Sequence, residues 1–124
     1  MKLIIAGSRK ISPSTELINA LLNQYGIIEE VDIYVSGGAK GVDTACEDFA
    51  EEMKELCGPD NIHLKVFEAN WTLHGKKAGP IRNRQMAEYA DALLLIWDGE
   101  SKGSANMKSE MLKLEKPVYE VILK

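Results

Sequence analysis

Short runs of apolar residues alternate along this chain with segments in which apolar residues recur every three or four positions. The runs are rich in Ile, Val and Leu, and there are five of them: Lys2–Ala6, Val31–Val35, Ile62–Phe67, Ala92–Trp97 and Pro117–Leu123. Continuous apolar runs of this length are typical of strands buried on both faces of a parallel sheet. The pattern therefore predicts five strands.

Four helices are predicted between these runs. They begin at Ser12-Pro13, at about Val42, at Gly79-Pro80 and at Ser104. In the first, Ser12 has a residue type favoured at the N-cap, and Pro13 suits the first helical position. Strand and helix alternate throughout, so we expect an α/β three-layer sandwich, with a mainly parallel sheet of about five strands and helices on both faces.

Length and composition restrict the class of protein further. The chain has 124 residues, enough for one domain (residues 1–124), and its net charge of -4 argues against bulk attraction to nucleic acid or to an anionic membrane. The first apolar run is too short for a signal peptide, and no run could span a membrane. Cys46 and Cys57 lie about three turns apart on one predicted helix, too far for a disulfide. We expect a cytoplasmic protein with reduced cysteines.

The loops that follow the predicted strands contain most of the glycine. In a parallel α/β fold, ligands bind outside the carboxyl ends of the strands. Six of the ten glycines fall in three such loops, which span residues 7–9, 36–43 and 98–104. Glycine lets these loops turn tightly and expose N–H groups, a geometry suited to phosphate, although short turns alone are the alternative. Neither G-x-G-x-x-G nor G-x-x-x-x-G-K-[ST] occurs, which argues against a dinucleotide dehydrogenase and a P-loop NTPase.

Charge is unevenly distributed in this acidic chain. Between Glu68 and Glu88 there is no acidic residue, but there are four basic ones: Lys76, Lys77, Arg82 and Arg84. Arg9, Lys40 and Lys102 could join them from the strand-end loops, and arginine is suited to bidentate contacts with phosphate. A solvated surface is the alternative. Arg82 and Arg84 are two apart on a helix, so they cannot share a face.

The other candidate side chains are less decisive. Asp98 follows a strand and is either a ligand contact or a turn residue, while Asp43 lies in the first turn of a helix, where a carboxylate is favoured in any case. Trp71 could stack on a base, with Asn70 beside it. His63 and His74 are far apart, so we expect no metal site and no cofactor. A nucleophilic serine has no support either, because G-x-S-x-G is absent.

Taken together, five segments carry a family resemblance. They read IIAGSRK (4–10), VSGGAKGVD (35–43), EANW (68–71), HGKKAGPIRNRQM (74–86) and ADALLLIWDGESKGSANM (90–107). This order resembles the small YspA-like (DUF2493) branch of the SLOG superfamily, which is related to the LOG, YpsA and DprA proteins. The resemblance implies a five-stranded Rossmann-like sheet that binds a nucleotide or nucleotide-derived ligand. It places the contacts at Gly7, Ser8, Arg9, Ser36, Gly37, Gly38, Gly41, Asp43, Lys76, Gly79, Arg82, Asn83, Asp98, Gly99, Ser101, Gly103 and Ser104.

The LOG relatives are phosphoribohydrolases that use an arginine and a glutamate following a P-G-G-x-G-T-x-x-E loop. Here Arg82 matches the arginine and Ser104 stands in for the threonine, but Met107 occupies the glutamate position. Methionine cannot activate water or stabilise an oxocarbenium-like centre. The leading hypothesis is therefore a nucleotide-binding domain. The alternative is hydrolysis of a nucleotide N-glycosidic bond with Arg82, Asp98 and Glu100 as catalytic residues, or with Asp43 as the acid.

Two expectations concern partners. Single-stranded DNA binding, as implied by the relation to DprA, is less favoured because only 6% of the residues are aromatic and the chain is acidic. Related proteins associate, so we expect a homo-oligomer, a dimer or a tetramer, and no membrane partner.

Overall fold

Parallel strands and helices alternate along the chain in the computed structural model, which describes residues 1–123. The strands are β1 (Lys2–Gly7), β2 (Ile33–Ser36), β3 (His63–Val66), β4 (Ala92–Trp97) and β5 (Val118–Ile122). The α-helices are α1 (Thr15–Gln24), α2 (Val42–Cys57), α3 (Trp71–His74), α4 (Ala78–Tyr89) and α5 (Lys102–Lys113), with short 3-10 helices η1 (Ile28–Glu30) and η2 (Gly75–Lys77). All five predicted strands are confirmed.

The sheet has the order β3-β2-β1-β4-β5, and every neighbouring pair is parallel. The chain builds outward from β1 to β2 and β3, then crosses to the other side of β1 to form β4 and β5. This reversal creates a crevice between the carboxyl ends of β1 and β4, where ligands bind in open α/β sheets. The α/β Rossmann-like fold is thereby confirmed.

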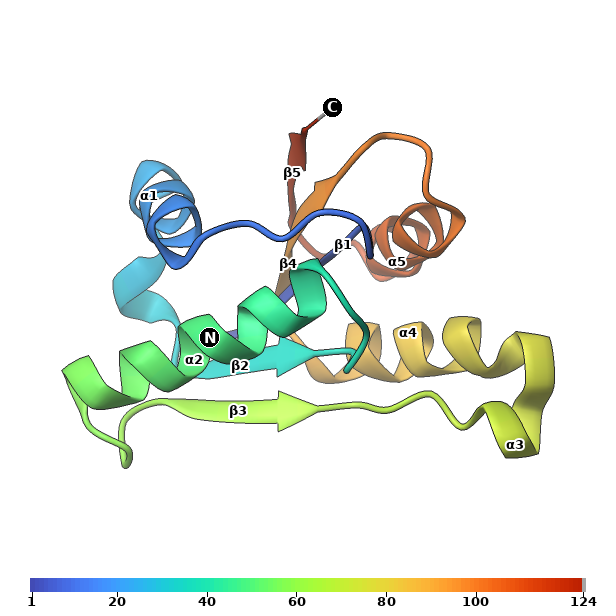
Figure 1. The fold of residues 1–124 in the computed structure, drawn as a ribbon, viewed down its shortest axis with the longest axis horizontal. Helices are drawn as coiled ribbons and strands as arrows, with labels where there is room; N and C mark the ends of the chain where they lie inside the picture. The colour runs from blue at the N-terminus through green and yellow to red at the C-terminus, as the bar shows by residue number, and fades with distance from the viewer. Residues whose placement is uncertain (124) are drawn as a thin grey trace.

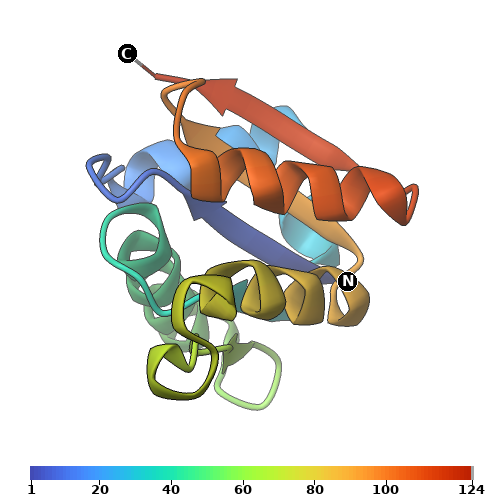
Figure 2. The same ribbon diagram turned by 90° about the vertical axis from the view of Figure 1, so that its right-hand side faces the viewer.

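Helices cover both faces of the sheet, as Figure 1 shows, with α1 and α2 on one side and α4 and α5 on the other. Side chains of β1 alternate between the two cores: Leu3 and Ile5 pack with α1 and α2, whereas Ile4 and Ala6 pack with α4 and α5. Figure 2 shows the loops after β1 and β2 and the start of α5 gathered at one end of the strands. The strand-end loops therefore lie together at one edge of the sheet, between the two layers of helices.

The predicted start of the first helix is wrong. Helix α1 begins at Thr15, and its N-cap is Ser14, whose Oγ accepts a hydrogen bond of 3.1 Å from the Leu17 N–H. Ser12 and Pro13 precede the helix. Both serines suit an N-cap, and a serine can cap a helix only when its hydroxyl reaches an N–H two or three residues ahead, as that of Ser14 does.

Two further observations concern the cysteines and the helices. Cys46 and Cys57 both lie on α2 and are free thiols, the first buried and the second exposed, as expected from their spacing. Within residues 1–123, no helix has both the length and the apolar character needed to cross a membrane.

Candidate functional site

A cavity of about 410 Å³ lies between the carboxyl ends of β1 and β4, and we call it the switch-point cavity. It is bounded by the loops after these two strands and by residues of α2, α4 and α5. Its lining residues are Ala6, Gly7, Ser8, Arg9, Lys10, Ala39, Asp43, Arg82, Asn83, Met86, Asp98, Glu100, Ser101, Gly103, Ser104 and Met107. Ten of the site residues expected from the resemblance, together with Glu100, are therefore brought together here.

The loop after β1 is fixed by close backbone approach. A Cβ on Gly7 would overlap the Ile96 carbonyl of β4, so only glycine fits at this point of the sheet. The next residue, Ser8, is buried; its N–H donates to Ile96 O (3.2 Å) and its Oγ accepts from Asp98 N (3.3 Å). Ser8 thus joins β1 to the end of β4.

The loop after β2 is held by side chains from β2 and α2. Ser36 Oγ donates to Glu47 Oε2 (2.8 Å) and accepts from Gly38 N (3.1 Å). Gly41 has a φ of 75°, and a Cβ there would lie 2.5 Å from Ser8 O, so this loop packs directly on the loop after β1. Ser36 and Gly41 line neither this cavity nor the one described below, and their contacts shape the loop.

Asp43 and Arg82 give the cavity its electrostatic character. Asp43 is only 6% exposed, and its Oδ2 accepts from Ala39 N (3.2 Å). Burial raises the pKa of Asp43 to about 6, against the opposing effects of that hydrogen bond and of Arg82. Burial also lowers the pKa of Arg82, partly offset by Asp43, although a guanidinium remains charged at any physiological pH.

Arg82 is held by neutral acceptors. Its Nε donates to Asn83 Oδ1 (2.9 Å), and its Nη1 donates to Gly37 O. Asn83, which is buried, in turn donates from Nδ2 to Asn106 Oδ1 (2.9 Å) and Gly103 O (3.3 Å) of α5. An arginine has five N–H donors, so three of those on Arg82 have no partner among the described residues. These donors are available to an anion.

The loop after β4 presents the N-terminus of α5 to the cavity. Asp98 Oδ1 accepts from the N–H groups of Glu100 and Ser101 (both 2.9 Å), and these bonds lower the pKa of Asp98. The carboxylate thus shapes the turn, which is the second of the two roles predicted for it. No described residue accepts from the next three N–H groups, those of Lys102, Gly103 and Ser104.

Ser104 adds a second unsatisfied group at the same place. The residue is 4% exposed and lines the cavity, yet its Oγ has no hydrogen-bond partner among the described residues. A buried hydroxyl without a partner is costly, and such groups are rare in folded proteins. This hydroxyl and the free N–H groups of α5 together form a set of donors suited to a bound anion.

The apolar lining comes from Met86 and Met107, both buried against the second core. Met107, which the resemblance matches to the LOG glutamate, supplies no charge, and the carboxylates that line the cavity are those of Asp43, Asp98 and Glu100. A sequence pattern could not have placed Met86 or Lys10 here, because their positions depend on how α4 and the β1–α1 loop approach β4.

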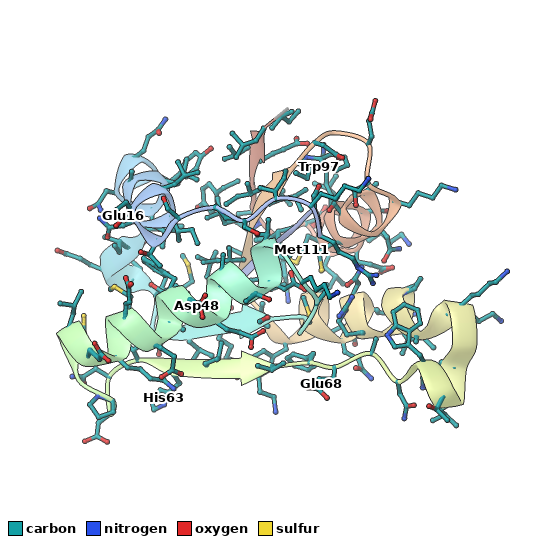
Figure 3. The ribbon with its side chains drawn as sticks, in the orientation of Figure 1. Glu16, Asp48, His63, Glu68, Trp97 and Met111 are labelled. Carbon is teal, nitrogen blue, oxygen red and sulfur yellow. The ribbon has the colours of Figure 1, made fainter. Side chains whose placement is uncertain are left out.

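A second cavity of about 550 Å³, which we call the Trp71 cavity, adjoins the first. Its lining residues are Arg9, Gly37, Gly38, Ala39, Lys40, Glu68, Ala69, Trp71 and Arg82, of which Arg9, Ala39 and Arg82 also line the switch-point cavity. Figure 3 shows Glu68 just beyond the end of β3, where the chain leaves the sheet toward α3. Glu68 belongs to the EANW segment that follows β3, but it was not among the residues expected to contact ligand.

Besides Ser36 and Gly41, four further residues expected to contact ligand lie outside these two cavities. Asn70 Oδ1 caps α3 by accepting from Leu73 N (3.0 Å), and Asn70 lines only a small third cavity of about 60 Å³. Lys76 lies in the exposed η2 helix, Gly79 is buried in α4, and Gly99 forms a turn with a φ of 86°. Among the described residues, no three His, Cys, Asp or Glu side chains are grouped as a metal site would require.

Known proteins resemble this chain both in sequence and in fold. No family model matches the chain. It is 32% identical over 123 residues to the Gene 61 protein of Mycobacterium phage D29, and the match covers 94% of this chain and 93% of that protein. Its fold is similar to that of DNA processing protein A (DprA) from Streptococcus pneumoniae, with a TM-score of 0.66, 20% identity and coverage of 99% of this chain. The chain spans about half the length of DprA, since 50% of that chain is matched. The relation to DprA is confirmed at the level of the fold.

Proposed function

The chain belongs to the same family as the Gene 61 protein of Mycobacterium phage D29, and we propose that it binds a nucleotide, or a phosphate-bearing molecule derived from one, in the switch-point cavity. The observation that carries this proposal is the buried Ser104 hydroxyl without a partner, next to three free N–H groups at the start of α5. A phosphate oxygen would satisfy these donors, and the helix dipole favours its charge. The YspA-like assignment within the SLOG superfamily is part of the same proposal.

Arg82 is one of three basic residues in the lining of the cavity, with Arg9 and Lys10. Its guanidinium is held by Gly37 O and Asn83 Oδ1, and Asn83 is bonded to α5. The cation is therefore fixed relative to the N-terminus of α5 before any ligand arrives. Such preorganisation lowers the entropic cost of binding.

The test compares Arg82 with Lys76, which belongs to the same basic segment but lies outside both cavities. A thermal-shift panel of nucleoside monophosphates and diphosphates, with inorganic phosphate as a further probe, identifies the ligand. At a hundred times its dissociation constant, a ligand stabilises the folded protein by about 2.7 kcal/mol, which shifts the Tm by several degrees. We expect Arg82→Gln to abolish the shift and Lys76→Ala to preserve it. Equal shifts in the wild type and in Arg82→Gln would refute the site.

A second candidate function is hydrolysis of a nucleotide N-glycosidic bond. It is favoured by Asp43, a buried carboxyl group that lines the cavity and has a pKa of about 6, close to the range useful for acid–base catalysis. Release of free base from a nucleotide would be measured for the wild type and for Asp43→Asn, Asp98→Asn and Glu100→Gln. Activity lost in Asp43→Asn alone assigns the acid to Asp43. If the wild type releases no free base, hydrolysis is ruled out and nucleotide binding remains the proposed function.

A further inference from the structure

The switch-point cavity and the Trp71 cavity share three lining residues, Arg9, Ala39 and Arg82. We infer that the two cavities form one binding site, in which the Trp71 cavity holds the nucleobase of a nucleotide whose phosphate lies at the start of α5. This inference rests on the proposed function and defines the ligand as a complete nucleotide rather than a sugar phosphate.

Trp71 is placed to offer a ring face. Its side chain is 52% exposed, although it is a large aromatic residue at the edge of a cavity. A Cβ built on Gly79 would lie 3.4 Å from Trp71 Cη2, so the indole rests against the first turn of α4. Asn70 holds α3 in place through its bond to Leu73 N (3.0 Å). The indole therefore contacts α4 and remains half exposed beside the cavity, where a base could stack on it.

The charged groups of the Trp71 cavity fit the polar half of a nucleotide. Arg9, Lys40 and Arg82 supply three positive charges, and Glu68 is the one acidic residue of its lining. The phosphate group of a nucleotide bound across the two cavities would lie near Arg9 and Arg82, which line both. Glu68 can accept hydrogen bonds from sugar hydroxyls or from an exocyclic amino group of the base.

The volumes of the two cavities leave room for a complete nucleotide. At about 410 and 550 Å³, each cavity lies within the range of 300 to 1,000 Å³ typical of small-molecule sites. A phosphate or a sugar phosphate at the start of α5 would leave the Trp71 cavity to solvent. A base stacked on Trp71 would occupy part of it while the phosphate reaches α5 past the shared residues.

The experiment measures two ligands that differ only in the base, adenosine 5′-monophosphate and ribose 5-phosphate, by calorimetry. Trp71→Ala is expected to weaken adenosine monophosphate binding at least about tenfold and to leave ribose 5-phosphate binding unchanged. Trp71→Phe restores a stacking ring and is expected to recover most of the affinity. The matched control is Leu73→Ala, which removes a side chain that is 72% exposed, on the same helix and outside the cavities. We expect both affinities of this control to equal those of the wild type.

Intrinsic fluorescence gives an independent readout, because the chain has two tryptophans. Trp97 is buried and its Nε1 donates to Glu120 Oε2 (2.8 Å), whereas Trp71 is half exposed. Adenosine monophosphate is expected to quench the wild type saturably, ribose 5-phosphate is not, and Trp71→Phe is expected to lose the quenching.

The possible results separate this inference from the proposed function. If Trp71→Ala binds both ligands as the wild type does, the base does not lie on Trp71, and the proposed function stands. If Trp71→Ala weakens both ligands equally, Trp71 has a structural role, and the inference is wrong. If the wild type binds neither these ligands nor any nucleotide of the thermal-shift panel, the proposed function fails together with the inference.

Discussion

Asp43 and Arg82 flank one backbone position: a Cβ placed on Gly37 would lie 2.8 Å from Asp43 Oδ2 and 2.8 Å from Arg82 Nη1. The carboxylate comes from the start of α2, and the guanidinium comes from α4 on the other face of the sheet. Glycine at position 37 therefore allows two charged groups from opposite layers to approach the same loop. Asp43 lines the switch-point cavity, Gly37 lines the Trp71 cavity, and Arg82 lines both.

We expect Gly37→Ala to displace Arg82 and Asp43, because the added methyl group has no space between them. Both contacts are with the ends of side chains, which can move aside, so we expect a modest loss of stability of about 1 kcal/mol. Loss of the fixed guanidinium is expected to weaken phosphate binding about tenfold or more. Chemical denaturation and calorimetry measure the two effects. For stability, Gly103→Ala is the control, because a Cβ there meets no atom within 4 Å. If both variants unfold at the same denaturant concentration, the steric account of Gly37 is wrong.

The raised pKa of Asp43 predicts a specific pH dependence of stability. Asp43 has a pKa of about 6 in the folded protein and about 3.9 in the unfolded chain, so the folded state binds this proton more tightly. The resulting stability is fully present below pH 4 and is lost as the pH rises through 6. Asp43→Asn removes the charge but keeps an oxygen that can accept from Ala39 N.

Free energies of unfolding at pH 4 to 8 test this expectation. The stability of Asp43→Asn relative to the wild type should rise between pH 4 and 6 and level off above, by up to about 3 kcal/mol. Curves for the two proteins that remain parallel across this range would show that the Asp43 pKa is not raised.

Ser104→Ala separates binding from stability. The Ser104 hydroxyl has no partner among the described residues, so its removal breaks no hydrogen bond and relieves the cost of burying an unsatisfied polar group. We therefore expect the free energy of unfolding without ligand to stay the same or to rise by about 1 kcal/mol. Phosphate affinity is expected to fall about fivefold to tenfold, because a hydrogen bond to the anion is lost. The measurements are denaturation without ligand and calorimetry with it. An unchanged affinity would remove Ser104 from the site.

Lys116 stabilises the fold at a distance from the cavities. Its Nζ donates to the carbonyl oxygens of Ala87 (2.7 Å), Glu88 (3.2 Å) and Ala90 (2.7 Å), at the C-terminus of α4. A cation at this end of a helix satisfies free carbonyls and interacts favourably with the helix dipole. Lys116→Ala is expected to cost about 1 to 2 kcal/mol in chemical denaturation.

A matched variant for Lys116 is Lys113→Ala. Lys113 is exposed, and its Nζ lies 3.6 Å from Glu110 Oε2. Surface ion pairs contribute little, so we expect a change below about 0.5 kcal/mol. Equal losses in the two variants would contradict the special role of Lys116.

The sequence predicted the strands because each is a continuous apolar run, as β4 (Ala92–Trp97) shows by being buried throughout. It also predicted the loops that form the cavity, because parallel strands place their carboxyl ends at one edge. The order of the strands was not predictable, since β1 could neighbour any other strand. That order decides that Gly7 meets Ile96 and that Arg82 reaches the loop after β2.

Three local features were missed for different reasons. Ser12 and Ser14 are equally good N-caps by residue type, so local sequence could not choose between them. The short helices α3 and η2 leave too few residues for a periodic pattern. Asn70 was expected at the ligand because it follows β3, but its side chain caps α3. The expected homo-oligomer stays a prediction, to be checked by analytical ultracentrifugation.

The central position of β1 has a consequence for how the protein is made. The switch-point cavity needs β1, from the first residues of the chain, and β4 with the start of α5, from residues beyond 90. The pairing of β1 with β4 joins residues that are far apart in the sequence. Such long-range contacts form slowly relative to local structure. A growing chain on the ribosome would therefore acquire the ability to bind its ligand late, and the ligand would select molecules whose folding is complete.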